Sequence, residues 1–151
     1  MFKEIIAGLA ILCSTTSWSF TCYITLAKDS CWIKKYNVTV NVLDAKTLKV
    51  LTTVTVPADT AWARQEFLCE PLQELKYTAT FTPTAFILDK DKDKVYSEKN
   101  IWNLPAAVKP GETAWNISVC YPFSFAGVPS PPEATEKCEC DFSKIPAPKP
   151  K

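Results

Sequence analysis

Residues 36–42 read Tyr-Asn-Val-Thr-Val-Asn-Val, and this stretch decides the fold. Its apolar side chains occupy every second position, which is the period of a β-strand with one face buried and the other in water. Even positions of residues 48–56 continue the pattern, with Thr52 as the one polar break. Residues 44–46 between the two runs are long enough for a hairpin turn, so we expect two antiparallel neighbouring strands.

The same alternation recurs along the rest of the chain. Firm patterns cover residues 75–81 and 115–121, and weaker patterns cover residues 21–27, 62–69, 85–88 and 95–102. Prolines follow several of these runs, where a residue without a backbone N–H can end a strand. About seven or eight short strands at this spacing predict an all-β, immunoglobulin-like antiparallel sandwich. Only residues 61–75 could instead be helical, and Pro71 interrupts that segment.

The period of two also predicts which side chains form the core. Ten side chains are expected to be buried together: Val38, Val40, Val42, Val54, Val56, Tyr77, Phe81, Trp115, Ile117 and Val119. Cys120 alternates to the opposite face, where a passing segment could reach it.

The N-terminus has the pattern of an export signal. A short basic start, Met1-Phe2-Lys3, precedes an apolar run over residues 5–13, and residues 17–19 place small side chains at the two positions that a signal peptidase reads. We therefore expect residues 1–19 to be removed and the mature chain to begin at Phe20. The apolar run is shorter than the roughly 20 residues that span a bilayer, so no stable membrane insertion is expected.

A lipid anchor is the competing interpretation of this leader. Cys13 lies inside it, but a lipid-modified cysteine follows a small residue, and bulky Leu12 stands at that position. We therefore interpret Cys13 as a small apolar residue of the leader.

The mature chain keeps an even set of cysteines, namely Cys22, Cys31, Cys69, Cys120, Cys138 and Cys140. An even set in an exported chain predicts three disulfides and an oxidising compartment, and leaves their pairing open. The chain has no histidine, and only one residue separates Cys138 from Cys140, so a zinc site and a redox-active pair are both disfavoured. Bonding these two neighbours to each other would strain the ring, so each is expected to bond a distant cysteine, with Cys120, Cys22 and Cys31 as accessible partners.

Composition divides the mature chain into a body and a tail. Most of the 12 prolines lie in the last thirty residues, where they favour extended polyproline conformations over strand pairing. We expect residues 20–122 to form the sandwich domain and residues 123–151 to form a proline-rich strap. Disulfides should hold the strap to the domain up to about residue 140, with a free end after Ile145.

Several function classes are disfavoured by what the sequence contains. Without histidine there is no Ser-His-Asp or Cys-His nucleophile system. Glu66, Glu70 and Glu74 are expected to be solvated surface charge rather than an acid–base set. The alternating Asp-Lys run of residues 89–94 lacks the glycine and the final glutamate of a calcium loop, and is expected to be a charged hairpin tip. The net charge of +1 indicates neither nucleic acid nor anionic lipid as a partner. We therefore expect no enzyme activity, no metal and no cofactor.

Aromatic side chains remain as candidates for contact with a partner. Trp62 and Trp102 lie in weakly patterned segments flanked by loops, which makes them better candidates for exposure than Trp115 on its core face. Phe123 and Phe125, on the proline-rich strap, are added as candidate contacts on a rigid surface.

Five short motifs resemble a known family. They are Ser30-Cys31-Trp32, Phe67-Leu68-Cys69-Glu70-Pro71, Pro110-Gly111-Glu112-Thr113-Ala114-Trp115, Val119-Cys120-Tyr121-Pro122 and Cys138-Glu139-Cys140-Asp141. Together they resemble a small periplasmic protein family of intracellular bacterial pathogens, associated with type IV secretion and with replication inside host cells. The resemblance covers nearly all of the mature chain and contains no catalytic signature. It implies a soluble, non-enzymatic accessory role in the periplasm and assigns no binding residues.

Two function hypotheses follow. The first is a periplasmic adaptor that binds protein components of a secretion apparatus in the cell envelope and could also form a homodimer. The second is an exported carbohydrate- or ligand-binding module that uses Trp62, Trp102 or both.

Overall fold

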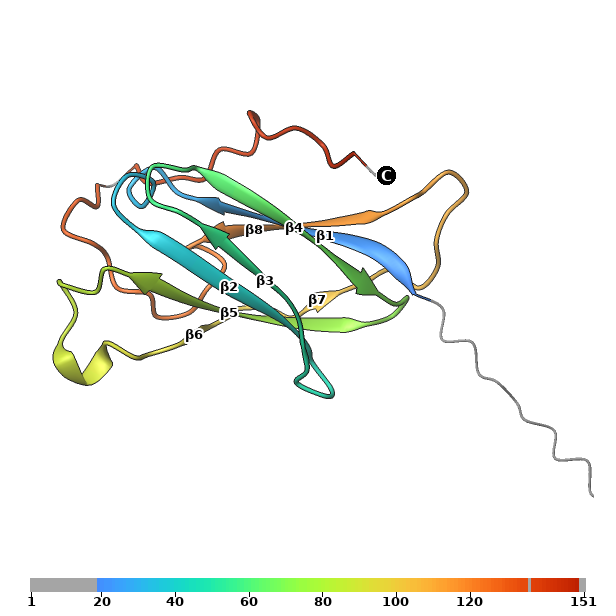
Figure 1. The fold of residues 1–151 in the computed structure, drawn as a ribbon, viewed down its shortest axis with the longest axis horizontal. Helices are drawn as coiled ribbons and strands as arrows, with labels where there is room; N and C mark the ends of the chain where they lie inside the picture. Colours follow the sequence, from blue (N-terminus) through green and yellow to red (C-terminus); the bar gives the residue numbers. More distant parts are fainter. Residues whose placement is uncertain (1–18, 136, 150–151) are drawn as a thin grey trace, which may run out of the picture.

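The protein is an all-β sandwich of two sheets that pack face to face (Figure 1). The structure is a computed structural model that describes residues 19–135 and 137–149. The strands in this part are β1 (Phe20–Lys28), β2 (Asn37–Asp44), β3 (Val50–Val56), β4 (Trp62–Cys69), β5 (Glu74–Thr82), β6 (Tyr96–Ser97), β7 (Trp102–Asn103) and β8 (Trp115–Tyr121), and a short 3-10 helix, η1 (Asp89–Asp91), precedes β6. The predicted leader and its Cys13 lie outside the described residues, apart from Ser19.

One sheet has three strands in the order β4-β1-β8, and the other has five, in the order β3-β2-β5-β6 with β7 beside β5. The predicted hairpin between β2 and β3 is present, with Val40 opposite Val54. One pair departs from the predicted antiparallel arrangement, because β1 runs parallel to β8. A parallel pair needs a long connection, and most of the domain lies between these two strands. Across the described residues, no helix has the length and hydropathy that crossing a membrane requires.

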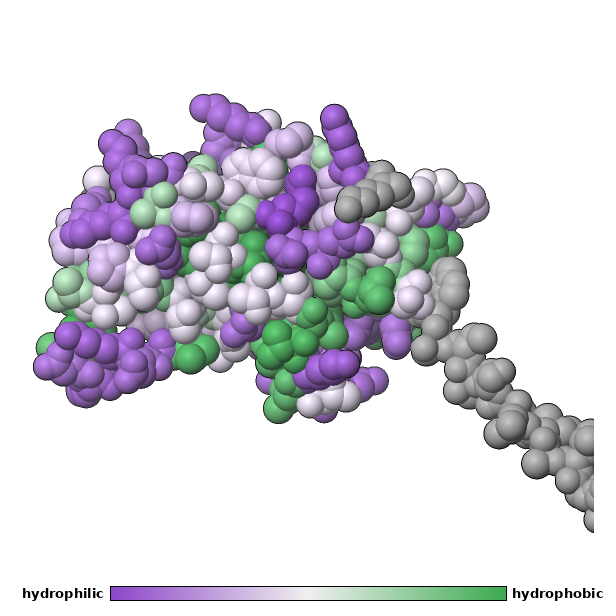
Figure 2. Space-filling model, viewed as in Figure 1, coloured by the Kyte–Doolittle hydropathy of each residue, from purple (hydrophilic) through white to green (hydrophobic). Residues whose placement is uncertain are grey.

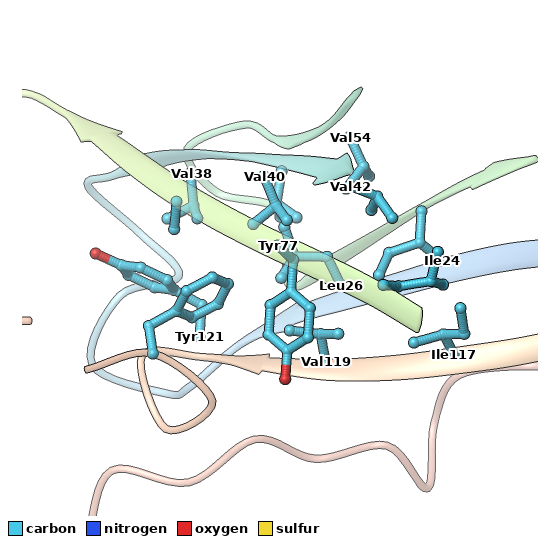
Figure 3. Close-up of a cluster of buried hydrophobic side chains, with 14 of the residues drawn as sticks. Ile24, Leu26, Val38, Val40, Val42, Val54, Tyr77, Ile117, Val119 and Tyr121 are labelled. Atoms are coloured by element: carbon cyan, nitrogen blue, oxygen red, sulfur yellow. The ribbon is translucent and has the colours of Figure 1, made fainter. Parts of the chain in front are cut away.

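The core lies between the sheets and contains all ten side chains that the period assigned to it. Figure 3 shows Val38, Val40 and Val42 of β2 facing Ile117 and Val119 of β8 across the sandwich. Because alternate residues of each strand point to opposite faces, a period of two in the sequence becomes a single apolar layer.

The alternating pattern is wrong in two places. Val50 is 50% exposed, because the register between β2 and β3 shifts after Val42, and Leu48 is 59% exposed, because it lies in the turn before β3. Figure 2 shows an apolar patch at the end of the β2–β3 hairpin, to which these two residues belong. Residues 85–88 form a turn before η1 instead of a strand, and the predicted strand at 95–102 is reduced to the two-residue strands β6 and β7.

Three disulfides are present. Cys22 bonds Cys69, Cys31 bonds Cys138 and Cys120 bonds Cys140, with Cα–Cα distances of 5.9, 5.5 and 6.0 Å. Cys138 and Cys140 thus each bond a distant cysteine, as expected. Cys22 was wrong as an accessible anchor for the tail, because it is fully buried between the sheets and joins β1 to β4.

Candidate binding surfaces

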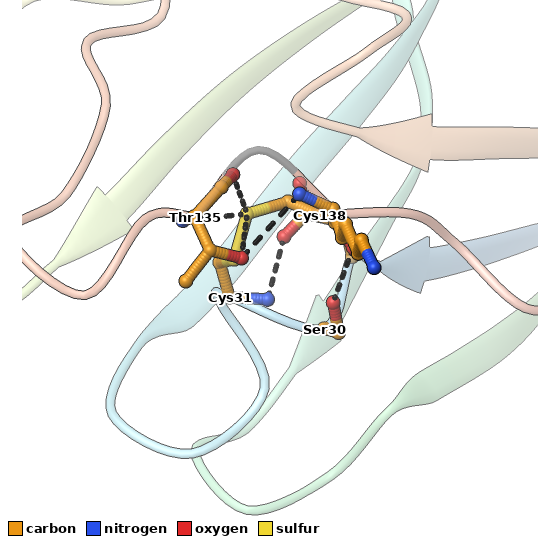
Figure 4. The surroundings of a disulfide bond; sticks show 6 residues. Ser30, Cys31, Thr135 and Cys138 are labelled. Atoms are coloured by element: carbon orange, nitrogen blue, oxygen red, sulfur yellow. Dashed lines mark hydrogen bonds between the residues drawn. A yellow bond between two sulfur atoms is a disulfide. The ribbon is translucent and has the colours of Figure 1, made fainter.

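The C-terminal strap begins at the end of β8 and is held to the loop after β1. The backbone N–H of Ser30 donates to the carbonyl of Glu139 at 3.1 Å, beside the Cys31–Cys138 disulfide. Thr135 lies beside the same disulfide, and its backbone nitrogen is 3.3 Å from Cys138 Sγ (Figure 4). Bonds of this kind keep the strap in one position relative to the sheets.

A second contact fixes the strap through Glu133. Its carboxylate accepts from the Tyr36 hydroxyl at 2.9 Å and from Lys35 Nζ at 3.2 Å. Burial is the main cause, and the hydrogen bond to Glu133 the second, that raises the pKa of Tyr36 to about 12. The neutral phenol therefore stays the donor over the whole physiological pH range.

Asp29, Cys31 and Cys138 come together at this end of the sandwich, with ligand atoms within 4.8 Å of one another. A cysteine binds a metal ion as its thiolate, and here the sulfurs of Cys31 and Cys138 are bonded to each other. Oxidised as it is, this cluster has only the Asp29 carboxylate to offer a cation.

A buried lysine organises the loops beside this cluster. Lys28 is 1% exposed, and its Nζ donates to the carbonyls of Ile33, Tyr36 and Pro57 at 3.0, 2.7 and 2.8 Å. Burial lowers the pKa of Lys28 to about 8, against an opposing effect of Asp59. Burial likewise raises the pKa of the neighbouring Asp29, against hydrogen bonds from the backbone N–H groups of Cys31 and Trp32. Lys28 was not predicted to be buried, and its only signal in the sequence is that it occupies the same face of β1 as Ile24 and Leu26.

The four predicted contact residues do not form one platform. Trp62 and Trp102 are half-buried, and lie at the start of β4 and on β7, in different sheets. Arg64 Cζ lies 5.2 Å from the centre of the Trp62 ring. Part of that ring is thus already in contact with a side chain of its own strand.

Phe123 and Phe125 have opposite roles. Phe123 is 74% exposed, whereas Phe125 is 2% exposed and was wrongly expected to be a contact residue. The tight turn after β8 directs Phe125 back into the core, where its ring centre lies 5.4 Å from that of Tyr77 and 5.6 Å from that of Tyr121. Phe125 thereby anchors the turn that presents Phe123.

Hydrogen bonds hold the Phe123 turn at both ends. Ser124 N–H donates to the Cys120 carbonyl at 2.8 Å, and Ser124 Oγ accepts from Cys120 N–H at 3.1 Å. The backbone N–H of Lys99 donates to the Ser124 carbonyl at 3.0 Å. Lys99 Nζ lies 4.9 Å from the centre of the Phe123 ring, so the exposed aromatic has a cation beside it.

A cavity of about 450 Å³ lies between β5 and residues 84–94. Its apolar wall includes Phe81, Ile87 and Tyr96, and its rim carries the charged residues 91–94. The Asp-Lys run, expected as a hairpin tip, instead includes η1 and forms a strongly hydrophilic corner of the molecule (Figure 2). Asp89 and Lys92 of this run form an ion pair at 2.7 Å.

No protein-family model, curated protein or solved structure matches the chain.

Proposed function

We propose that this protein is an exported, non-enzymatic adaptor that binds a protein partner in the cell envelope. The observation that carries the proposal is Phe123, a large aromatic side chain that is 74% exposed on a turn fixed by its neighbours. Aromatic residues of this kind contribute a large share of the binding energy of protein interfaces. Because the turn is already ordered, it would lose little conformational entropy when a partner binds.

Lys99 gives the surface a polar component. A cation beside an exposed ring favours a partner with an acidic or carbonyl-rich rim around an apolar pocket, since the ring fills the pocket while Nζ contacts the rim.

The finer parts of the proposal concern the fold type, the compartment and the partner. We place the chain in the periplasm, as an accessory of a type IV-like secretion apparatus, and describe its sandwich as immunoglobulin-like. The disulfides and the export pattern support an oxidising compartment outside the cytoplasm, and the motif resemblance supports the secretion role. The description as immunoglobulin-like concerns the two packed sheets and not the disulfide, because Cys22–Cys69 lies within one sheet whereas antibody domains carry theirs between the sheets.

A photo-crosslinking amino acid at position 123 tests this proposal in the organism that makes the protein. We expect adducts with envelope proteins of a secretion apparatus. The control places the same crosslinker at position 53, where Thr53 is exposed on the edge strand β3, and it should not give these adducts. Phe123→Ala should reduce co-purification of the same partner. Identical adducts at both positions, or intact secretion after deletion of the gene, would contradict the proposal.

The carbohydrate-binding alternative has less support. Arg64 already lies against Trp62, and Trp102 is in the other sheet, so the two indoles do not form a joint stacking platform. Saturable binding on a glycan array that is lost in Trp102→Ala would favour this alternative.

A further inference from the structure

The outer face of the β4-β1-β8 sheet is covered although it points away from the core. Ile24 and Leu26 of β1 point inward, so Tyr23, Thr25 and Ala27 point outward, yet these three are only 8%, 1% and 2% exposed. An outer sheet face in contact with water would leave such side chains exposed.

The cover is the last part of the chain. After Cys140, whose sulfur lies 3.5 Å from the Ala27 carbonyl, the tail runs along the outside of this sheet (Figure 1). Pro148 reaches the same hollow as Tyr23 and Trp115. A free end after Ile145 was predicted from the sequence, and the contacts of Pro146 and Pro148 contradict that prediction.

A row of polar side chains crosses the covered face. Arg64 Nε donates to Thr25 Oγ1 at 2.8 Å, Thr25 donates to Asn116 Oδ1 at 2.7 Å, and Asn116 Nδ2 donates to Ser118 Oγ at 3.2 Å. These bonds hold the guanidinium in place, and its Nη2 donates to the carbonyl of Pro146 at 2.8 Å. Each proline offers a carbonyl but no N–H, so a fixed donor next to an aromatic ring suits a proline-rich segment.

The tail does not fill the surface on which it lies. A hollow of about 320 Å³ remains beside Pro148, lined by Tyr23, Trp115 and residues 111–114. The sequence has no cysteine after Cys140, so residues 145–149 are held without a covalent bond and can leave while all three disulfides stay closed.

From this arrangement we propose that the outer face of the β4-β1-β8 sheet is a groove for an extended, proline-containing segment of a partner protein, and that residues 145–149 occupy it when the partner is absent. The partner segment displaces the tail, accepts a hydrogen bond from Arg64 Nη2 on one of its carbonyls, and extends into the hollow beside Tyr23. The inference shares with the proposed function only the idea that the partner is a protein, because it uses none of the residues around Phe123.

The test compares the full chain with a variant that ends at Lys144, which keeps every disulfide. The probe is a fluorescent synthetic peptide with the sequence of residues 143–151, and binding is measured by fluorescence polarisation. We expect saturable binding to the truncated protein and about 100-fold weaker binding to the full chain, since a tethered tail competes at an effective concentration in the millimolar range. Circular dichroism and a thermal melt establish that the truncated protein is folded.

Two variants of the truncated protein locate the site. Arg64→Ala should weaken peptide binding about tenfold or more, because it removes a charge-assisted hydrogen bond. Lys99→Ala, which removes a cation beside Phe123, is the matched control and should leave the affinity unchanged. A peptide with every proline replaced by alanine should bind about tenfold more weakly or worse, because it loses the preformed extended conformation.

Three outcomes would overturn the inference. They are absence of saturable binding to the folded truncated protein, equal affinity for the full chain, and a dimer of the full chain that disappears on truncation, which would make a second copy the recipient of the tail. None of them bears on the crosslinks at position 123, so the two proposals fail separately.

Discussion

Replacing Lys28 with methionine removes a buried cation while keeping a side chain of similar length. Of its three acceptors, the Ile33 carbonyl also accepts from Asp59 N–H at 2.8 Å and the Pro57 carbonyl from Thr60 N–H at 3.1 Å, so both retain a donor. The Tyr36 carbonyl, whose bond to Nζ is buried and the shortest of the three, loses the most. Leaving one buried acceptor unpaired and weakening two others, partly offset by the apolar methionine, should cost about 2 kcal/mol at pH 7.5.

The cost should grow as the pH rises. The pKa of Lys28 is about 8 in the folded protein and 10.5 ordinarily, so between these values the unfolded chain binds more protons than the native protein, and stability rises with pH. From pH 7.5 to 9 this linkage adds about 1 kcal/mol to the wild-type protein and nothing to Lys28→Met. The difference between the two proteins should therefore reach about 3 kcal/mol at pH 9. Below pH 7 the lysine is protonated in both states and the difference should be constant.

Urea unfolding with the disulfides intact measures the free energy of unfolding of both proteins at pH 7.5 and at pH 9. Lys34→Met, an exposed lysine in the loop that Lys28 holds, is the control and should change the free energy of unfolding by less than about 0.5 kcal/mol. A difference between wild type and Lys28→Met that stays constant or shrinks from pH 7.5 to 9 would show that Lys28 is hydrated in solution. Unchanged stability in Lys28→Met would show that its three carbonyl contacts contribute nothing.

Two further predictions concern the disulfides and the Phe123 turn. Thiol labelling of the exported protein under denaturing, non-reducing conditions should find no free thiol among the six mature cysteines. Peptide mapping should recover the pairs Cys22–Cys69, Cys31–Cys138 and Cys120–Cys140. Two or more reactive thiols per molecule would reject this connectivity. Phe125→Ala should lower the free energy of unfolding by about 3–5 kcal/mol and Phe123→Ala by less than about 0.5 kcal/mol, because only Phe125 is buried; equal losses would contradict the division of roles in the turn.

The period of two predicted the core because burial of a strand face is a local property of the sequence. Val38, Val40 and Val42 needed no knowledge of their partners to be assigned to the interior. The bonding of Cys138 and Cys140 to distant cysteines followed from ring geometry alone.

The remaining features depend on segments that are distant in the sequence. Lys28 is buried because three carbonyls from two later loops converge on it, and no local pattern records that convergence. Phe125 differs from Phe123 only through the turn that the end of β8 imposes. Residues 85–88 lack a strand partner in the described chain, and Phe86 and Ile87 pack against the core from a loop, while Leu88 is exposed.

The order of the cysteines sets a problem for biosynthesis. Numbered in chain order from Cys22, they pair first with third, second with fifth and fourth with sixth, so no native bond joins two successive cysteines. An oxidase that coupled thiols in order of appearance would make three bonds, all of them wrong. Cys31 must wait for a partner 107 residues later, while the partner of Cys22 appears after 47. If the thiols are coupled in that order, the native pairs can form only through later thiol–disulfide exchange, and we expect scrambled protein to accumulate where no disulfide isomerase is present.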